Sequence, residues 1–373
     1  MLQQEGCKNR LQRVKQLMQE KEYDSILLVD TRNVYYLEGV LLPKGHPVLL
    51  WLNQDDRPLL VTDSKETPAD AEVMEFATYS PRRVLGNPWL NALLRMKERW
   101  KNTSGRRIAI EKDAANGIVV DALRDAFPDS PLQDLSDDLA DLRRSRDPDE
   151  VEILRRIASV AEAGFARARE VVRAGISELD VYVEICAAME REAGCPLEIH
   201  GDFSTGPRSI TQGGVPTARI LERGDLCVFD LFPMCWGYQA DLCRTIAVGV
   251  PSHLQKQGYE LVSRAMVLAE GMLQPGRPAR EVYQAVREFF DRDPLSAGTF
   301  WHHLGHGIGM GGHEDPRLIP ESDHLLRTGD VICIEPGIYN PKLQGGLRIE
   351  NTYRLTSEGP VQLNSHPLYL ALH

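Results

Sequence analysis

The pattern of apolar and polar residues along the first third of the chain predicts strands that alternate with helices, and therefore a small α/β domain. Within residues 8–21, apolar side chains recur at helical spacing, and Val119–Ala126 predicts another helix. Short apolar runs predict strands at residues 25–29, 48–52, 59–62 and 107–110. No polar residues cluster here as a catalytic site would, so we expect this part to pack, to dimerise or to cover a substrate.

A different pattern begins near residue 147, where Asp147 can cap a helix and Pro148 suits its first position. Predicted helices follow at about residues 148–172, 179–192, 253–273 and 279–290. Two predicted hairpins alternate with them: residues 227–232 with 237–248 around Pro233–Trp236, and residues 331–335 with 347–355 around Pro341–Gly346. This order predicts an α+β domain with an antiparallel sheet, and it divides the chain into residues 1–145 and 146–373.

Composition and charge narrow the class of protein. A length of 373 residues exceeds the roughly 100–200 residues of one domain, which agrees with two domains. A net charge of −11 argues against a nucleic-acid surface. No apolar run is long enough to span a membrane, and the N-terminus lacks a signal-peptide pattern. Seven cysteines without Cys-x-x-Cys spacing predict a reduced, cytoplasmic protein.

The stretch Phe300–Pro316 is the first sign of chemistry, because it holds four of the ten histidines together with five glycines. Glycine lets a backbone bend tightly and approach a ligand closely. Histidine is the commonest metal ligand and the usual acid–base group near neutral pH. A surface loop with incidental histidines would show the same composition, so this stretch needs support from elsewhere in the chain.

Each predicted hairpin carries two acids in an apolar context. Asp230 and Asp241 lie eleven residues apart in the first hairpin, and Glu335 and Glu350 lie fifteen apart in the second. A buried carboxylate is costly unless it is paired or binds a metal, and four together could not all stay ionised without cations. Two divalent ions would balance them, with His306 as a nitrogen ligand. Such mixed ligation suits Mn, Co, Zn or Fe(II) better than Ca.

Each acid also has an ordinary structural explanation. These are a turn cap for Asp230, an ion pair with Arg244 for Asp241, a strand-end charge before Pro336 for Glu335, and an ion pair with Arg348 for Glu350. His302, His303 and His313 could be satisfied polar residues. Taken jointly, five candidate ligands at matching strand and loop positions favour a metal site.

Several motifs follow one another in a fixed order. They are Asp230-x10-Asp241 within Phe229–Thr245, Gly305-His306-Gly307-Ile308-Gly309, His313-Glu314, Ile334-Glu335-Pro336-Gly337 and Arg348-Ile349-Glu350-Asn351-Thr352. The sequence thereby resembles the pita-bread metallopeptidases, the family of methionine aminopeptidase, prolidase and Xaa-Pro aminopeptidase. Residues 11–39 resemble the N-terminal domain of the prolidase and creatinase branch. The resemblance implies a C-terminal pita-bread domain and a smaller N-terminal creatinase-like α/β domain.

The resemblance also implies a dinuclear site, usually of manganese, cobalt, zinc or iron. Its ligands would be Asp230, Asp241, His306, Glu335 and Glu350. Asp241 and Glu350 would bridge the ions, a bridging hydroxide would attack the scissile carbonyl, and Glu335 would pass the proton to the leaving nitrogen. His313 would stabilise the tetrahedral intermediate. His302, Arg348 and Tyr238 would contact the substrate.

One segment departs from the family pattern. The peptidases carry Gly-Pro-Asn-x-x-x-Pro-His-Gly-x-x-Pro-Thr, and its histidine lies near the scissile bond. Here residues 206–217 read Gly-Pro-Arg-Ser-Ile-Thr-Gln-Gly-Gly-Val-Pro-Thr, so Gly213 stands at the histidine position. Gln212 or Arg208 could make the substrate contact instead. Asn351 replaces a common aspartate, which would alter the hydrogen bonds around the last ligand.

The sequence therefore predicts a cytoplasmic, homodimeric hydrolase that carries two divalent metal ions, with manganese as the first candidate. It would cleave an amide C–N bond in short peptides with proline after the scissile bond. An alternative, favoured by Gly213, is a family enzyme recruited as a hydrolase or lyase to a non-peptide small molecule. A metal-free binding module is a third possibility, and the presence of all five ligands argues against it. No nucleic-acid or membrane partner is expected.

Overall fold

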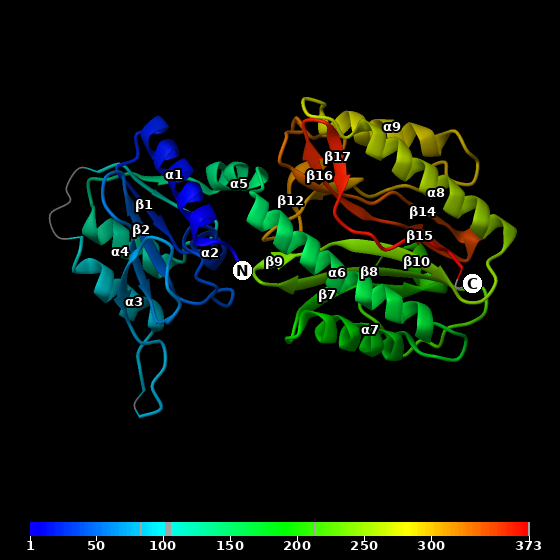
Figure 1. Ribbon diagram of the computed structural model, residues 1–373, viewed down its shortest axis with the longest axis horizontal. Coiled ribbons are helices and arrows are strands. Elements are labelled where there is room, and N and C mark those ends of the chain that lie inside the picture. The colour runs from blue at the N-terminus through cyan, green and yellow to red at the C-terminus, as the bar shows by residue number, and fades with distance from the viewer. Residues whose placement is uncertain (83, 101–105, 212, 372–373) are drawn as a thin grey trace. The chain divides into compact units, whose positions relative to one another are not determined.

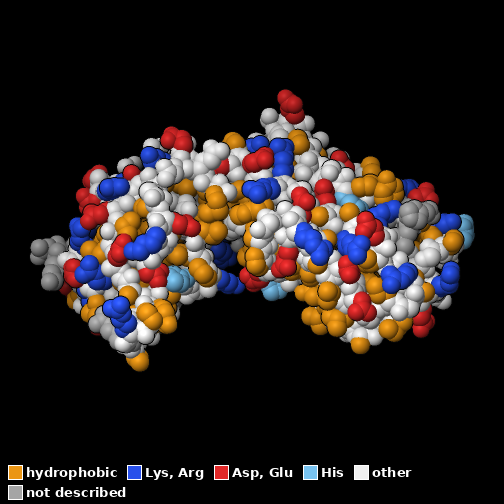
Figure 2. Space-filling model, turned by 60° about the horizontal axis from the view of Figure 1, so that its bottom comes forward, with side chains coloured by type: hydrophobic (Ala, Val, Ile, Leu, Met, Phe, Trp, Pro, Cys, Tyr) orange, Lys and Arg blue, Asp and Glu red, His pale blue; other side chains and the backbone are white. Residues whose placement is uncertain are grey.

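The computed structural model describes residues 1–82, 84–100, 106–211 and 213–371, and the chain forms two compact units, Met1–Arg143 and Arg144–His373 (Figure 1). Among the described helices, none combines the length and the apolar composition that crossing a membrane requires. On the face drawn in Figure 2, acidic and basic side chains are interspersed over both units. The described residues of that face therefore form no extended basic patch of the kind that binds nucleic acid.

The first unit is built on a six-stranded sheet in the order β4-β3-β2-β1-β5-β6. Its elements are α1 (Gln4–Glu20), β1 (Ser25–Leu28), α2 (Thr31–Glu38), β2 (Leu49–Asn53), β3 (Leu59–Thr62), β4 (Glu72–Glu75), α3 (Pro88–Lys97), β5 (Ile108–Ile110), α4 (Gly117–Ala126), β6 (Leu132–Asp134) and α5 (Ser136–Arg144). The four strands predicted from apolar runs are all present. Strands β4 and β6 lie at the two edges of the sheet and have no buried residues, which explains why no apolar run predicts them.

The second unit opens with the helix predicted from Asp147. Helix α6 spans Pro148–Val171, and the carboxylate of Glu150 accepts a hydrogen bond of 2.9 Å from the backbone N–H of Asp147. Helix α7 (Glu178–Ala193) packs beside it, and the two bury apolar residues against a sheet in the order β10-β8-β7, with β9 paired to β8 (Figure 1). Its strands are β7 (Glu198–Thr205), β8 (Leu226–Cys235), β9 (Tyr238–Gln239) and β10 (Leu242–Ala247).

The first predicted hairpin is present, but its turn lies further along the chain than expected. Strand β8 continues through Pro233 to Cys235, so the turn predicted at Pro233–Trp236 is wrong. Cys235 pairs with Tyr238, and the two residues between them, Trp236 and Gly237, have φ values of 51° and 75°. Positive φ at both central positions is the geometry of a tight two-residue hairpin loop, which a proline-centred turn would not form.

The second half of this unit repeats the plan of two helices and a sheet. Helices α8 (His253–Met272) and α9 (Ala279–Asp291) pack on a five-stranded sheet in the order β12-β11-β13-β16-β17. Its strands are β11 (Gly305–Gly307), β12 (Glu314–Leu318), β13 (Val331–Ile334), β16 (Asn351–Thr356) and β17 (Gly359–Gln362).

The second predicted hairpin is divided between two sheets. Strand β13 pairs with β16, whereas β14 (Gly337–Asn340) and β15 (Gly345–Arg348) form a separate two-stranded sheet. The strand predicted over residues 347–355 is therefore interrupted between Arg348 and Asn351. Pro336 lies two residues after the end of β13 and has no N–H to continue a ladder, so the chain leaves the first sheet there.

Candidate metal centre

The five predicted metal ligands come together in one buried cluster, although they belong to separate segments. Each of them is at most 5% exposed. Asp230, Asp241 and Glu350 each offer an oxygen within 4.8 Å of the others, and His306, Glu335 and Glu350 form a second such group. Glu350 belongs to both groups, so it lies where a carboxylate could contact two neighbouring ions.

The acids lie in or beside strands, at points that the backbone explains. Asp230 is inside β8, and Asp241 lies between β9 and β10. Glu335 directly follows β13 and Glu350 directly precedes β16, at the two places where the chain passes between sheets. His306 is the middle residue of β11, which lies between β12 and β13.

Several carboxylate oxygens of this cluster have no protein partner. Among the described residues, Oδ1 of Asp230, Oδ1 of Asp241 and both oxygens of Glu350 are buried without a hydrogen bond. Burial raises the pKa of Asp230 to about 6, and burial together with neighbouring carboxylates raises the pKa values of Asp241 and Glu350 well above their usual range. The protein alone therefore does not stabilise four anions here, and this set of oxygen and nitrogen donors fits divalent cations.

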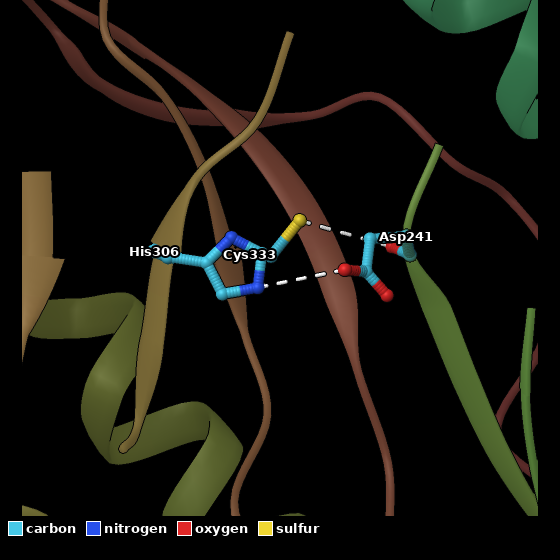
Figure 3. A group of neighbouring side chains, drawn as sticks. All are labelled: Asp241, His306 and Cys333. Carbon is cyan, nitrogen blue, oxygen red and sulfur yellow. Dashed lines mark hydrogen bonds and ion pairs between the residues drawn. The ribbon is translucent and has the colours of Figure 1, made fainter. Parts of the chain in front are cut away.

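His306 has the tautomer that a metal ligand requires. Its Nδ1–H donates to the carbonyl of Gly307 at 2.9 Å, which leaves the lone pair of Nε2 directed into the cluster. Nε2 lies 3.5 Å from Oδ2 of Asp241 (Figure 3). It also lies 3.6 Å from Oε1 of Glu335. Burial lowers the pKa of His306 to about 4, so the ring is neutral at pH 7.

Cys333 lies beside these groups without acting as a ligand in our interpretation. It pairs with His306 across β11 and β13, and its Sγ donates to the backbone carbonyl of Asp241 at 3.8 Å (Figure 3). Burial raises the pKa of the Cys333 thiol well above its usual range. Because the thiol has partners within the protein in the carbonyl of Asp241 and the hydroxyl of Thr352, we assign it a packing role.

Glu335 is held ionised by the histidines around it. Its Oε1 lies 3.0 Å from Nδ1 of His303, and its Oε2 lies 4.0 Å from Nδ1 of His302. Burial acts to raise the pKa of Glu335, but the interactions with His303 and with the other neighbouring histidines outweigh burial and lower the pKa below its usual range. The sequence assigned no role to His303, because a histidine three positions before a ligand carries no distinctive signal.

His302 has partners at both ring nitrogens. Nδ1–H donates to the carbonyl of His303 at 2.6 Å, so Nε2 is the acceptor and receives the hydroxyl of Tyr339 at 3.0 Å. The Tyr339 oxygen in turn accepts from Nη1 of Arg348 at 3.4 Å. Burial lowers the pKa of His302 to about 4. Tyr339 was not anticipated, since one tyrosine in an apolar strand looks like any core residue.

Arg348 joins the cluster of candidate metal ligands to an acid that the sequence analysis did not single out. Its Nη2 donates to Oδ2 of Asp230 at 2.5 Å and to Oδ2 of Asp202 at 2.8 Å. Asp202 belongs to β7 and lies directly opposite Asp230 on β8. No motif marks Asp202, because only the pairing of these two strands brings it to the site.

The remaining residues predicted to contact the substrate or the reaction intermediate lie at different distances from the candidate ligands. His313 is exposed, and the centroid of its ring lies 4.2 Å from that of His306. Tyr238 instead donates to Glu150 of α6 at 2.9 Å. Arg208 pairs with Glu178 at the start of α7 and donates to the carbonyl of residue 215 at 3.2 Å. Gln212 lies outside the described residues.

Comparison with known proteins gives two family matches that together span most of the chain. The chain matches Metallopeptidase family M24 over residues 152–357 and the Creatinase/Prolidase N-terminal domain over residues 10–145. It is 30% identical over 360 residues to a Xaa-Pro dipeptidase of Pyrococcus furiosus, which covers 95% of this chain and 97% of that protein. It is 29% identical over 366 residues to a putative dipeptidase of Bacillus subtilis, with 96% and 98% covered.

Solved structures show the same architecture over nearly the whole length. The prolidase from Pyrococcus horikoshii OT3 superposes with a TM-score of 0.82 at 27% identity, covering 97% of this chain and 99% of that one. The Xaa-Pro dipeptidase from Bacillus anthracis superposes with a TM-score of 0.85 at 26% identity, with 98% and 99% covered.

Proposed function

The chain belongs to metallopeptidase family M24 and carries a creatinase/prolidase N-terminal domain, and from this premise we propose that it hydrolyses Xaa-Pro dipeptides or similarly short peptides. The observation that carries the proposal is the buried cluster of four acids and one histidine, whose orphaned oxygens lack any protein partner among the described residues. The relatives named as Xaa-Pro dipeptidases support the substrate class.

The residues that would hold two divalent cations are Asp230, Asp241, His306, Glu335 and Glu350. When bound, such cations activate water for attack and stabilise the negative charge that develops on the carbonyl oxygen. Manganese is the first candidate, and cobalt, zinc and iron suit the same oxygen and nitrogen donors.

The chain's own groups would handle the proton and the substrate. Glu335 is ionised, so it can accept a proton and deliver it to the leaving nitrogen. His313 is exposed and lies beside His306, where a ring N–H can reach an oxygen of the tetrahedral intermediate. Both nitrogens of His302 are engaged, so we assign it the role of holding Tyr339, and through it Arg348, beside the cluster.

Metal content and hydrolysis test the proposal together. Purified protein should contain about two divalent ions per chain, a chelator should abolish hydrolysis of Xaa-Pro dipeptides, and added Mn²⁺ should restore it. Asp241→Asn should lower both metal content and rate, whereas Glu288→Gln on the exposed face of α9 serves as the control for loss of one acid. A protein that contains no metal and does not respond to Mn²⁺ would contradict the proposal.

A second candidate is a hydrolase or lyase reaction on a non-peptide small molecule at the same centre. Gly213 favours it, because this residue cannot supply the imidazole that the family pattern places near the scissile bond. Full metal occupancy combined with background rates on every Xaa-Pro dipeptide would select this candidate over the first.

We also propose a cytoplasmic homodimer. The cysteines in the described part of the chain form no disulfide, as expected in a reducing compartment. Light scattering would test the dimer, since a chain of 41.9 kDa should then show about twice that mass.

A further inference from the structure

Gly213 stands at the position of the family's histidine, and the side chain of Asp202 from β7 fills the space beside it. A Cβ atom built on Gly213 would overlap the carboxylate of Asp202. The neighbouring Gly214 is fixed along the edge strand β7, because its carbonyl accepts a hydrogen bond of 2.7 Å from the backbone N–H of Phe203. A side chain at position 213 and the carboxylate of Asp202 therefore compete for one volume.

The carboxylate of Asp202 lies at the metal cluster. Residues directly opposite on antiparallel strands have their side chains on one face of the sheet, and Asp202 lies opposite Asp230. Two like charges in this position repel each other, and Nη2 of Arg348 bonds both of them. The Asp202 side chain is 27% exposed, whereas that of Asp230 is 4% exposed, so Asp202 is the one that a substrate can reach.

Arg348 is not free to bind a substrate carboxylate. Its Nη2 is shared by two carboxylates, its Nη1 donates to Tyr339, and its Nε donates to Cys243. The five carboxylates at the site and this one guanidinium leave four negative charges, which two divalent cations would balance. The loaded site would thus have no surplus positive charge, and its reachable side chain is an anion that only accepts hydrogen bonds.

We propose that Asp202 is a specificity-determining residue that binds a positively charged nitrogen of the substrate. The proposal rests on the hydrolase function proposed above. In a peptide, the charged nitrogen is either the free α-ammonium beside the scissile amide or an ammonium on the first side chain. A charge-assisted hydrogen bond to a carboxylate is roughly twice as strong as a neutral one, so either source would be favoured over an uncharged substrate.

Matched substrates separate the two sources. Lysyl-proline and norleucyl-proline differ in the side-chain ammonium, and norleucyl-proline and its N-acetyl derivative differ in the α-ammonium. We expect the wild type to prefer the charged member of at least one pair, and Asp202→Asn to reduce that preference in kcat/KM about tenfold. Glu198→Gln, at the exposed start of the same strand, removes one acid away from the site and should leave the preference unchanged.

A binding experiment keeps this proposal separate from the proposed function. Calorimetric titration of Mn²⁺-loaded protein with lysine, norleucine and N-acetylnorleucine needs no turnover. In either pair, weaker binding to Asp202→Asn of the ligand with the additional ammonium group, with binding of the ligand that lacks it unchanged, would support the role of Asp202 even if no dipeptide is hydrolysed. An equal loss for all ligands, or no loss, would overturn it, because a residue that only positions Arg348 cannot discriminate by ligand charge. Asp202→Ala combined with Gly213→His is the second variant, and it should likewise lose the preference for charge.

Discussion

Replacing Glu350 by glutamine should have opposite effects on the metal-free and the metal-loaded protein. The side chain is fully buried, and neither of its oxygens has a hydrogen-bond partner among the described residues. Asp230 and Asp241 each offer an oxygen within 4.8 Å of it. Burial and these two neighbours raise the pKa of Glu350 well above its usual range, so in metal-free protein the neutral carboxyl persists to a higher pH than it does in the unfolded chain.

The expected magnitude follows from the cost of that protonation. An exposed glutamate has a pKa of about 4.3, so a carboxyl held neutral up to pH 7 would cost about 4 kcal/mol there, and this is the upper limit for Glu350. A pKa that is raised in the folded state makes stability fall as pH rises, and glutamine removes this contribution. We expect Glu350→Gln to stabilise the metal-free protein by up to about 4 kcal/mol at pH 7 and by about 1 kcal/mol at pH 5.

The metal-loaded protein should respond in the other direction. There Glu350 would be an anion between two cations, and removing one member of a buried charge pair typically costs about 3–5 kcal/mol. Urea denaturation with a chelator and with Mn²⁺, at pH 7 and pH 5, measures all four changes, and Glu288→Gln on α9 is the exposed control. A change of the same sign in both metal states, or a metal-free stabilisation independent of pH, would refute this reasoning.

Three further predictions concern other parts of the chain. Gly213→Ala should lower the free energy of unfolding by about 1–3 kcal/mol in the wild type, because the added Cβ meets the Asp202 carboxylate. In an Asp202→Ala background the same change should cost almost nothing, and a double-mutant cycle in urea measures the difference. Arg146→Met should destabilise by about 3–5 kcal/mol, since the buried guanidinium pairs with two carboxylates, whereas exposed Arg292→Met should change stability by less than about 0.5 kcal/mol in the same assay. Burial raises the pKa of Glu111 to about 7, so the folded protein retains a proton that the unfolded chain has lost. The stability of the folded state therefore falls as the pH rises from about 4.5 to 7. Glu111→Gln should make the melting temperature depend less on pH over this range.

The sequence predicts best where one local pattern determines the outcome. Helix α6 begins at Pro148 because its cap and first turn are all local. The strands of the first unit follow from apolar runs, and the metal-cluster acids stand out because charge inside an apolar strand is costly. The pita-bread and creatinase-like fold follows from the motifs, and the family matches confirm it.

What the sequence missed depends on partners that are distant in the chain. Asp202 reaches the cluster only through the register of β7 and β8, and Tyr339 matters only because His302 and Arg348 meet it. The break at Glu350 follows from pairing β14 with β15 instead of extending β13. Alternating hydrophobicity does not distinguish one long strand from two strands in different sheets.

The origin of the ligands in two halves of one unit has a consequence for biosynthesis. Asp230 and Asp241 leave the ribosome first, and Glu350 follows more than a hundred residues later. At usual elongation rates this interval lasts roughly 5–20 seconds. During that time the nascent chain has acids without the groups that complete the site, so it cannot capture metal with full affinity. Metal loading at full affinity would therefore follow the emergence of Glu350, and a cell short of metal would accumulate folded chains in which these acids lack the cations that balance them.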